Sequence, residues 1–342
     1  MKKILVTGGL GFIGSNLVNY LISKNYFIIN IDKSSYSSNK KYFINSKNKN
    51  YIFFKIDIKN KSKLYKIIKK FKPVGIFNLA AETHVDRSID DSKNFINSNI
   101  LGVHNILEVL RKIKREHRIN IRFVQVSTDE VYGDMPFRKS ADENYNYNPS
   151  SPYSASKASA DQIIKAYKRT YNLDTIIANA CNNYGPCQFP EKFIPKIIYN
   201  LINNKPIEIY GNGKNIREWI YVKDSCEALL KIFLKGKNGE NYNIGTGIRL
   251  KNIDIVNKIV LLAKNKNILF GKKRRFIFVK DRPGHDKRYA LISKKIKKKI
   301  GWVYKTELDK GLSETIDWYI KNKSFFKKIP KKEFAKRFGL QV

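Results

Sequence analysis

Short apolar runs alternate with helical stretches over the first half of the chain. The β-branched run Ile4–Thr7 ends in glycines, and apolar residues from Phe12 to Leu21 then recur at helical spacing, which predicts a strand, a tight turn and a helix. This alternation of strands and helices predicts a parallel sheet with helices on both faces, the doubly wound α/β (Rossmann) fold. Further strands are expected at 27–31, 51–56, 74–79, 121–126 and 175–178, and helices near 61–71, 92–114 and 153–171.

The pattern loosens after about residue 180 into shorter elements rich in proline and glycine. We therefore expect two units. The first is the Rossmann domain over 1–180, with a return segment near 218–245, and the second is a smaller α/β lobe over 181–325.

Composition excludes several classes of protein. The 342 residues are 42% hydrophobic, and no run of about 18 apolar residues occurs, so we expect a cytoplasmic location and no membrane partner. The three cysteines lack paired CxxC spacing, which argues against a disulfide framework. The four histidines show no ligand spacing either, and no metal is expected.

The charge balance is the one abnormal figure. Lys and Arg number 67 against 29 Asp and Glu, a net charge of +38, and such an excess raises the question of a nucleic-acid partner. The lysines are spread through polar stretches that are typical of a solvated surface, so no specific nucleic-acid partner is expected. A non-enzymatic RNA-binding or partner-binding protein with a dehydrogenase-like fold stays open as an alternative.

A glycine pattern follows the first predicted strand. Gly9-x-Gly11-x-x-Gly14 opens the first predicted helix, where glycines allow a pyrophosphate to approach the helix N-terminus. Asp32 lies 32 − 14 = 18 residues further on, at the end of the second strand, where an acid accepts ribose hydroxyls. The pattern predicts NAD over NADP, although Lys33 beside the acid would suit a 2′-phosphate.

Tyr153 and Lys157 are four residues apart and share one face of a predicted helix. An ammonium beside a phenol favours the phenolate, so the tyrosine can act as a base below its ordinary pKa of about 10. Asp129 and Glu130 follow the fifth strand, at the edge of the sheet where ligands bind. Alone, these two acids would be a solvated turn; beside the Tyr–Lys pair they predict an acid and a base that act together.

Several segments together resemble the extended short-chain dehydrogenase/reductase superfamily. Within it, the chain is most similar to the nucleotide-sugar 4,6-dehydratases, above all those that act on dTDP-glucose, from residue 1 to about residue 320. The segments are Thr7–Gly14, Ala80–Ser88, Ser127–Gly133, Tyr153–Ala158, Asn182–Pro186, Phe189–Lys192, Tyr210–Trp219 and Asp281–Asp286.

The resemblance implies a hydro-lyase that converts dTDP-glucose to dTDP-4-keto-6-deoxyglucose for deoxysugar biosynthesis, of the rhamnose type found in cell-surface polysaccharides. It implies a tightly bound NAD that is regenerated in each turnover. Tyr153 with Lys157 would remove the O4 proton, Thr128 would bind the same oxygen, Glu130 would remove the C5 proton and Asp129 would protonate the departing C6 hydroxyl. A nucleotide-sugar 4-epimerase needs no such acids, so they favour a dehydratase; that epimerase and a UDP-glucose 4,6-dehydratase remain the alternatives.

The resemblance also implies the binding residues. For the cofactor they are Gly8, Gly11, Phe12, Ile13, Gly14, Asp32, Asp57, Ile58, Leu79, Ala80, Ala81, Tyr153, Lys157 and Asn183. For the substrate they are Thr83, Thr128, Asn182, Lys192, Tyr210, Arg217, Asn252, Arg282 and His285, with the two guanidinium groups suited to a diphosphate. The apolar stripes of helices 92–114 and 153–171 imply a homodimer held by a four-helix bundle.

Overall fold

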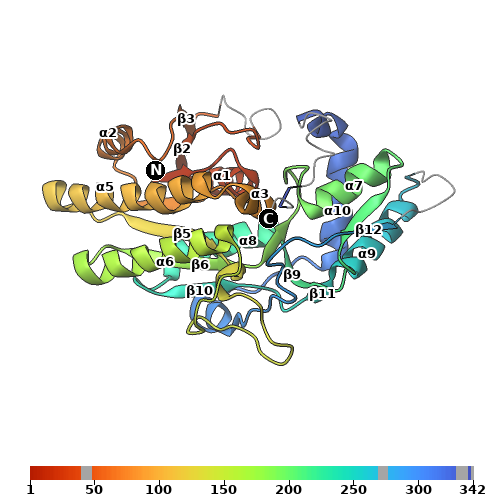
Figure 1. Ribbon diagram of the computed structural model, residues 1–342. Coiled ribbons are helices and arrows are strands. Elements are labelled where there is room, and N and C mark those ends of the chain that lie inside the picture. The colour runs from red at the N-terminus through yellow and green to blue at the C-terminus, as the bar shows by residue number, and fades with distance from the viewer. Residues whose placement is uncertain (40–47, 269–275, 329–337, 340–342) are drawn as a thin grey trace.

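The computed structural model describes residues 1–39, 48–268, 276–328 and 338–339 (Figure 1). A seven-stranded parallel sheet forms the larger lobe, with the strand order β10-β6-β5-β4-β1-β2-β3. This order confirms the predicted doubly wound fold. The strands are β1 (Lys3–Thr7), β2 (Phe27–Asp32), β3 (Tyr51–Lys55), β4 (Gly75–Asn78), β5 (Arg122–Thr128), β6 (Thr175–Ala180) and β10 (Asn241–Ile244).

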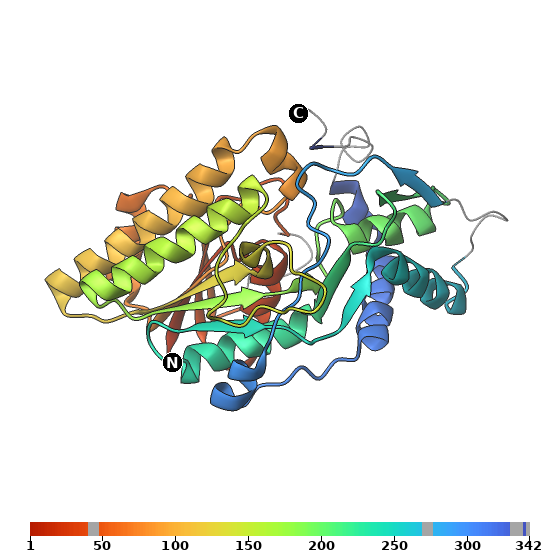
Figure 2. The ribbon, with the colours of Figure 1, turned by 60° about the horizontal axis from the view of Figure 1, so that its bottom comes forward.

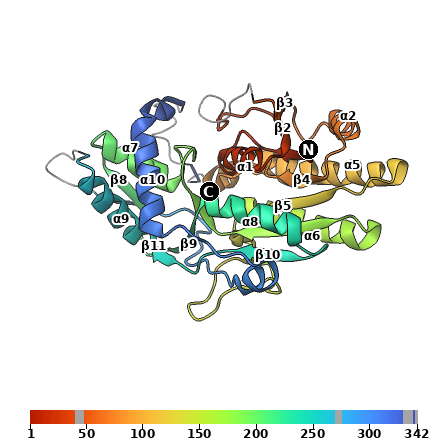
Figure 3. The same ribbon diagram turned by 180° about the vertical axis from the view of Figure 1, so that it is seen from behind.

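Helices cover both faces of this sheet (Figures 2 and 3). On one face α1 (Phe12–Ser23) packs beside α8 (Val222–Lys235), and on the other lie α2 (Lys61–Phe71), α5 (Gly102–His117) and α6 (Pro152–Tyr171). Because both faces are buried, the strands are near-continuous apolar runs, which is why the sequence predicted them.

The start of α6 is fixed by local sequence. The Ser151 side chain accepts a hydrogen bond from the backbone N–H of Ser154, the Ser154 side chain bonds back to Ser151, and Pro152 occupies the first helical position. This capping box places Tyr153 in the first turn of the helix, at the edge of the sheet.

The helix expected near 92–114 is interrupted. Its segment consists of α4 (Lys93–Phe95), a π-helical stretch η1 (Ile96–Leu101) and α5, preceded by α3 (Val85–Asp90). A π-helical turn is frequent at functional sites, and this one brings Ser98 to the cofactor cavity described below.

The smaller lobe holds two short sheets. Strands β7 (Asn182–Tyr184), β9 (Ile216–Tyr221) and β11 (Arg249–Lys251) form one, and β8 (Ile207–Tyr210) pairs with β12 (Phe276–Val279). Helix α8 and strand β10 return the chain to the large sheet, whereas residues 218–221, expected in that return segment, belong to β9. The remaining elements are the helices α7 (Phe193–Ile202), α9 (Asn252–Asn265) and α10 (Leu308–Lys321) and the short η2 (Asp129–Tyr132), η3 (Ile296–Ile300) and η4 (Lys323–Lys328).

Candidate active site

The turn between β1 and α1 has room only for glycine. Gly8 has φ +69°, and a Cβ there would lie 2.6 Å from the Ala80 nitrogen; a Cβ on Gly14 would lie 2.2 Å from the Gly8 carbonyl oxygen. No side chain caps α1 after Gly11, so its first N–H groups are open to an anion. These features fit the pyrophosphate of a dinucleotide.

Asp32 lies at the end of β2 beside this turn. Its carboxylate accepts hydrogen bonds from the backbone nitrogens of Leu10 (3.1 Å) and Ser34 (2.7 Å). Burial raises the pKa of Asp32, against the lowering effect of these two bonds. The Lys33 ammonium lies 2.7 Å from Glu82, so its charge is neutralised there, and the arrangement suits the ribose of NAD better than a 2′-phosphate.

A small cavity is formed at this edge of the sheet. Eight predicted cofactor residues line it: Gly8, Gly11, Asp32, Asp57, Ile58, Leu79, Ala80 and Ala81. Phe12, Ile13 and Gly14 form the first turn of α1 instead of lining the cavity. The sequence analysis missed Ile31, Lys33, Ser35, Ser37, Ser38, Ile56 and Ser98, most of which lie in loops without a motif.

Asp129 and Glu130 differ in their surroundings. The Thr128 hydroxyl accepts a hydrogen bond from the Glu130 nitrogen (3.3 Å), which fixes the single turn of η2 that carries both acids. Burial, with Glu130 and Glu218 nearby, raises the pKa of Asp129 well above its usual range. Burial also raises the pKa of Glu130, but Arg282 and Arg217 act in the opposite direction. The pair therefore favours a protonated Asp129 beside an ionised Glu130.

Tyr153 lies in the first turn of α6, facing these two acids. Burial raises the pKa of its phenol, Glu130 and Asp129 add to that effect, and Thr128 opposes it. Burial and the two acids therefore outweigh the expected phenolate-favouring effect of Lys157 on the pKa of Tyr153. The physical reason is that the Lys157 ammonium donates its hydrogen bond to the carbonyl oxygen of Val126, at 2.7 Å.

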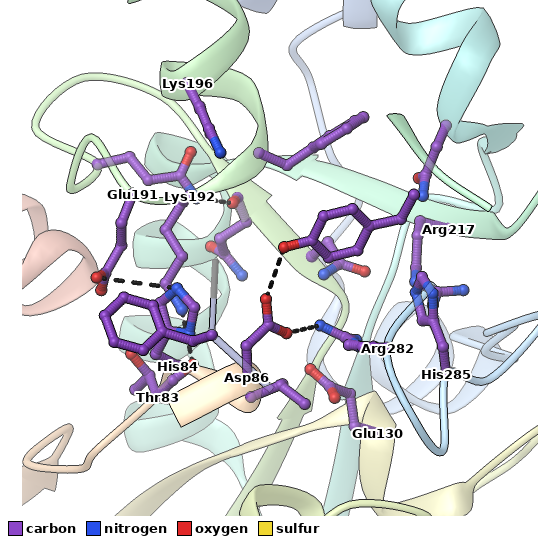
Figure 4. A pocket seen from close by; sticks show the side chains of 18 of the residues that line it. Thr83, His84, Asp86, Glu130, Glu191, Lys192, Lys196, Arg217, Arg282 and His285 are labelled. Carbon is purple, nitrogen blue, oxygen red and sulfur yellow. Dashed lines mark hydrogen bonds and ion pairs between the residues drawn. The ribbon is translucent and has the colours of Figure 1, made fainter. Parts of the chain in front are cut away.

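A second cavity of about 250 Å³ lies between the two lobes (Figure 4). In it the Arg282 guanidinium lies 2.8 Å from the Asp86 carboxylate, and the Tyr210 hydroxyl donates a hydrogen bond to the same carboxylate at 2.9 Å. Eight predicted substrate residues line the cavity: Thr83, Asn182, Lys192, Tyr210, Arg217, Asn252, Arg282 and His285.

Four more predicted positions differ from expectation. Thr128 does not line the second cavity but ends β5 beside Glu130, which does line it. Asn183, expected at the cofactor, lines the second cavity because β7 pairs with β9 of the smaller lobe. Tyr153 and Lys157, also expected at the cofactor, line neither cavity. They lie on α6, where the Tyr153 nitrogen donates a hydrogen bond to the Ser88 hydroxyl on α3 and Lys157 contacts β5.

The second cavity is lined by residues with buried polar atoms that lack hydrogen-bond partners in the described residues. Within the described part of the chain, five such side-chain atoms have no hydrogen-bond partner: Asn182 Oδ1, Asn183 Oδ1, Gln188 Oε1, Trp219 Nε1 and Arg282 Nε. Buried polar groups are normally paired, so these atoms fit a polar ligand.

Other lining residues carried no sequence motif that revealed their role. Tyr289 donates hydrogen bonds to Asp286 (2.8 Å) and Glu130 (3.4 Å), and Arg217 lies 4.1 Å from the centre of its ring. The sequence analysis also missed His84, Val85, Asp86, Gln188, Glu191, Phe193, Lys196, Glu208, Trp219 and Phe338. Several of these stand inside or next to the quoted segments, and that nearness was the only available clue.

A family model described as GDP-mannose 4,6 dehydratase matches residues 5–315. The chain belongs to this family. The dTDP-glucose 4,6-dehydratase of Escherichia coli is 43% identical over 359 residues, covering 99% of each chain. The resemblance found in the motifs is thereby confirmed.

Two solved structures of relatives contain NAD. The dTDP-glucose 4,6-dehydratase of Bacillus anthracis has a TM-score of 0.86 and 40% identity, covering 96% of this chain and 99% of that one. DesIV, the dTDP-glucose 4,6-dehydratase of Streptomyces venezuelae, has a TM-score of 0.87 and 35% identity, covering 95% and 98%. The family is thus shown over almost the whole chain.

No group of three or more His, Cys, Asp or Glu side chains in the described residues could hold a metal ion. Among the helices of the described segments, none has the length and apolar character needed to cross a membrane.

Proposed function

We propose that the protein is a hydro-lyase that converts dTDP-glucose to dTDP-4-keto-6-deoxyglucose with bound NAD, a step of deoxysugar biosynthesis. The observation that carries this proposal is the pair Asp129 and Glu130 beside Tyr153. Their surroundings raise the pKa of Asp129 more strongly than that of Glu130, so the pair can supply an acid and a base. The dTDP-glucose 4,6-dehydratases at about 40% identity over nearly the whole chain support it.

The cofactor residues fit a dinucleotide. Gly8, Gly11 and the open start of α1 would hold the pyrophosphate, and Asp32 would bind the adenosine ribose. When bound, NAD⁺ supplies a hydride acceptor and a positive charge near Tyr153. That charge, together with Lys157, favours the phenolate, so Tyr153 can take the O4 proton as C4 is oxidised.

The elimination needs a base and an acid on adjacent carbons. Oxidation to the 4-ketone acidifies the C5–H bond, and Glu130 removes this proton while its electron pair forms the C5–C6 double bond. Asp129 gives its proton to the C6 hydroxyl, which leaves as water. Hydride then enters at C6, and Glu130 returns its proton to C5. Tyr153 releases its proton and Asp129 takes one up, by way of solvent, so the cycle closes with one water released.

The substrate cavity suits a nucleoside diphosphate. Arg217 and Arg282 face it with guanidinium donors, and Lys192 adds a third positive charge next to Glu130. The Lys192 ammonium also donates a hydrogen bond to the Thr83 carbonyl oxygen at 2.6 Å, which places it at the boundary of the two lobes. Forked guanidinium groups bind phosphate oxygens in pairs, so we assign this region to the diphosphate.

The alternatives differ in product and in nucleotide. Purified protein is incubated separately with dTDP-glucose and UDP-glucose, and the products are separated by chromatography. We expect dTDP-4-keto-6-deoxyglucose from the first and at least tenfold slower turnover of the second. Equal turnover would favour the UDP-glucose 4,6-dehydratase, a galactose product would favour the epimerase, and no product from either would overturn the proposal.

The proposal also covers the oligomeric state, the two functional units and the location of the protein. A homodimer is supported by exposed apolar side chains along the η1 and α6 surface, namely Ile96, Leu101 and Tyr171. The two functional units, 1–180 with the return segment and 181–325, and the cytoplasmic location remain predictions. The described site gives no support to the RNA-binding alternative, since Glu130, proposed as a catalytic base, lines the cavity between the lobes.

A further inference from the structure

The carboxylate of Asp161 is buried behind the reacting groups and has no part in the mechanism above. It lies one turn after Lys157 on α6, so the two side chains share a face of the helix, and it is 0% exposed. A buried carboxylate is costly unless it is paired or hydrogen-bonded. The groups around Asp161 must therefore stabilise its carboxylate.

Two hydroxyl groups hold one oxygen of this carboxylate. Ser127 Oγ donates a hydrogen bond to Asp161 Oδ2 at 2.6 Å, and the Tyr147 hydroxyl donates to the same oxygen at 3.1 Å. In the described residues the other oxygen, Oδ1, has no hydrogen-bond partner. Because Ser127 directly precedes Thr128, the carboxylate joins α6 to the strand end that carries the proposed acid and base.

A second connection reaches the same strand end. The Asn179 amide on β6 donates hydrogen bonds to the Tyr147 hydroxyl (3.3 Å) and to the Thr128 carbonyl oxygen (3.4 Å). Asp161 thus belongs to a network that runs from α6 through Tyr147 and Asn179 to Thr128. The network fixes the position of β5 relative to Tyr153.

Lys157 depends on Asp161 for its charge. The Lys157 side chain is 4% exposed, and its hydrogen-bond acceptor, the Val126 carbonyl, is neutral. Burial lowers the pKa of Lys157 to about 8, and Asp161 is the charged group that acts in the opposite direction. Without that carboxylate the ammonium would lose its proton at a lower pH.

We propose that Asp161 is a positioning residue of the reaction. Its carboxylate keeps the Lys157 ammonium protonated and holds the end of β5 in place against the Tyr153 face of α6. The proposal rests on the proposed function, because it assigns a role in the oxidation at C4. The ionisable groups near the pair come from three segments. They are Tyr153 and Lys165 on α6, Tyr147 in the loop that precedes α6, and Asp129, Glu130 and Tyr132 in η2.

The test compares pH profiles of kcat for dTDP-glucose in the holoenzyme and in Asp161→Asn, which keeps the shape and removes the charge. We expect the high-pH limb of the profile, where Lys157 loses its proton, to move down by about one pH unit, with KM changed by less than about twofold. Asp174→Asn is the matched control. It removes a carboxylate that pairs with Arg122 (3.0 Å) at the opposite end of β5, and it should leave the profile unchanged.

An unchanged high-pH limb in Asp161→Asn would overturn the proposal, and so would an equal shift in Asp174→Asn. If Asp161→Asn does not fold, Asp161→Glu is measured in the same way. This variant keeps the charge, so we expect a lower kcat with the limb in its original place, and a downward shift would contradict the proposal. Absence of turnover in the unchanged protein would instead refute the proposed function itself, so the two failures are distinguishable.

Discussion

The guanidinium of Arg282 lies 2.8 Å from the carboxylate of Asp86, although 196 residues separate them in the chain. Asp86 belongs to α3 beside the large sheet, and Arg282 comes from the smaller lobe (Figure 4). Burial acts to raise the pKa of Asp86, but Arg282, together with His84 and the Tyr210 hydroxyl, holds that pKa below its usual range. The ion pair therefore turns Arg282 toward the cavity, where its Nε has no partner among the described residues.

Loss of this orientation should weaken substrate binding. In Asp86→Asn the guanidinium keeps its charge but loses the ionised partner, worth about 1.5–3 kcal/mol for a hydrogen bond to a charged group. We expect KM for dTDP-glucose to rise about tenfold or more, with kcat within about threefold, in steady-state kinetics. Asp309→Asn, which breaks a surface pair with Lys258, should change neither; a lower kcat with unchanged KM in Asp86→Asn would count against this role.

Glu130→Gln separates the oxidation from the elimination. The amide cannot accept the C5 proton, so we expect a fall in product formation of about 10²- to 10⁴-fold. Exchange of the C5 hydrogen with deuterated water should stop, while some oxidation at C4 persists as reduced nicotinamide absorbance. Full retained activity would remove Glu130 from the mechanism.

Asp129 is the proposed acid of the elimination. Burial beside Glu130 and Glu218 raises the pKa of Asp129 well above its usual range, which favours the protonated form that this role needs. In Asp129→Asn the leaving C6 hydroxyl receives no proton, and the slow step should become elimination, seen as reduced nicotinamide that accumulates after mixing with substrate. Product formation at the original rate in this variant would contradict the assignment.

The buried imidazole of His84 makes the free energy of unfolding depend on pH. Burial, with Lys192 nearby, lowers its pKa to about 3, and the unfolded chain has the ordinary value of about 6.5. Above pH 6.5 both states are neutral and nothing changes. As the pH falls below 6.5, only the unfolded chain takes up the proton, so the free energy of unfolding falls, by about 2 kcal/mol at pH 5.

His84→Asn tests this dependence. Asparagine can still accept the hydrogen bond from the Arg87 nitrogen that begins α3. Urea unfolding at pH 7.5 and pH 5 should show a smaller difference in this variant than in the unchanged protein. His117→Asn, at the end of α5, serves as the control, and an equal acid sensitivity in His84→Asn would disprove the assignment.

The large sheet could be predicted because its strands are buried on both faces. Ile4–Thr7 and the later apolar runs are continuous for that reason. The glycine turn with Asp32 predicted a cofactor site at the edge of the sheet, where the structure has a small cavity. The break of the 92–114 helix at η1 could not be predicted. A π-helical turn leaves the apolar spacing of a helix almost unchanged, and tertiary packing decides it.

The electrostatics of the site also could not be predicted from the sequence. Spacing alone placed Lys157 and Tyr153 together, but only the fold shows that the ammonium bonds to Val126 and that Asp161 lies behind it. Tyr289 was missed because it reaches Glu130 from 159 residues away along the chain. Such contacts depend on how the two lobes meet, which local sequence does not encode.

Transfer of hydride from C4 to C6 is the central claim, and an isotope experiment tests it most directly. The purified protein is given dTDP-glucose that carries deuterium at C4, without added NAD, and the product is examined by nuclear magnetic resonance. The account predicts a 4-keto-6-deoxy sugar with the deuterium in the C6 methyl group. A product with deuterium still at C4, as an epimerase would give, or a methyl group without deuterium, would contradict it.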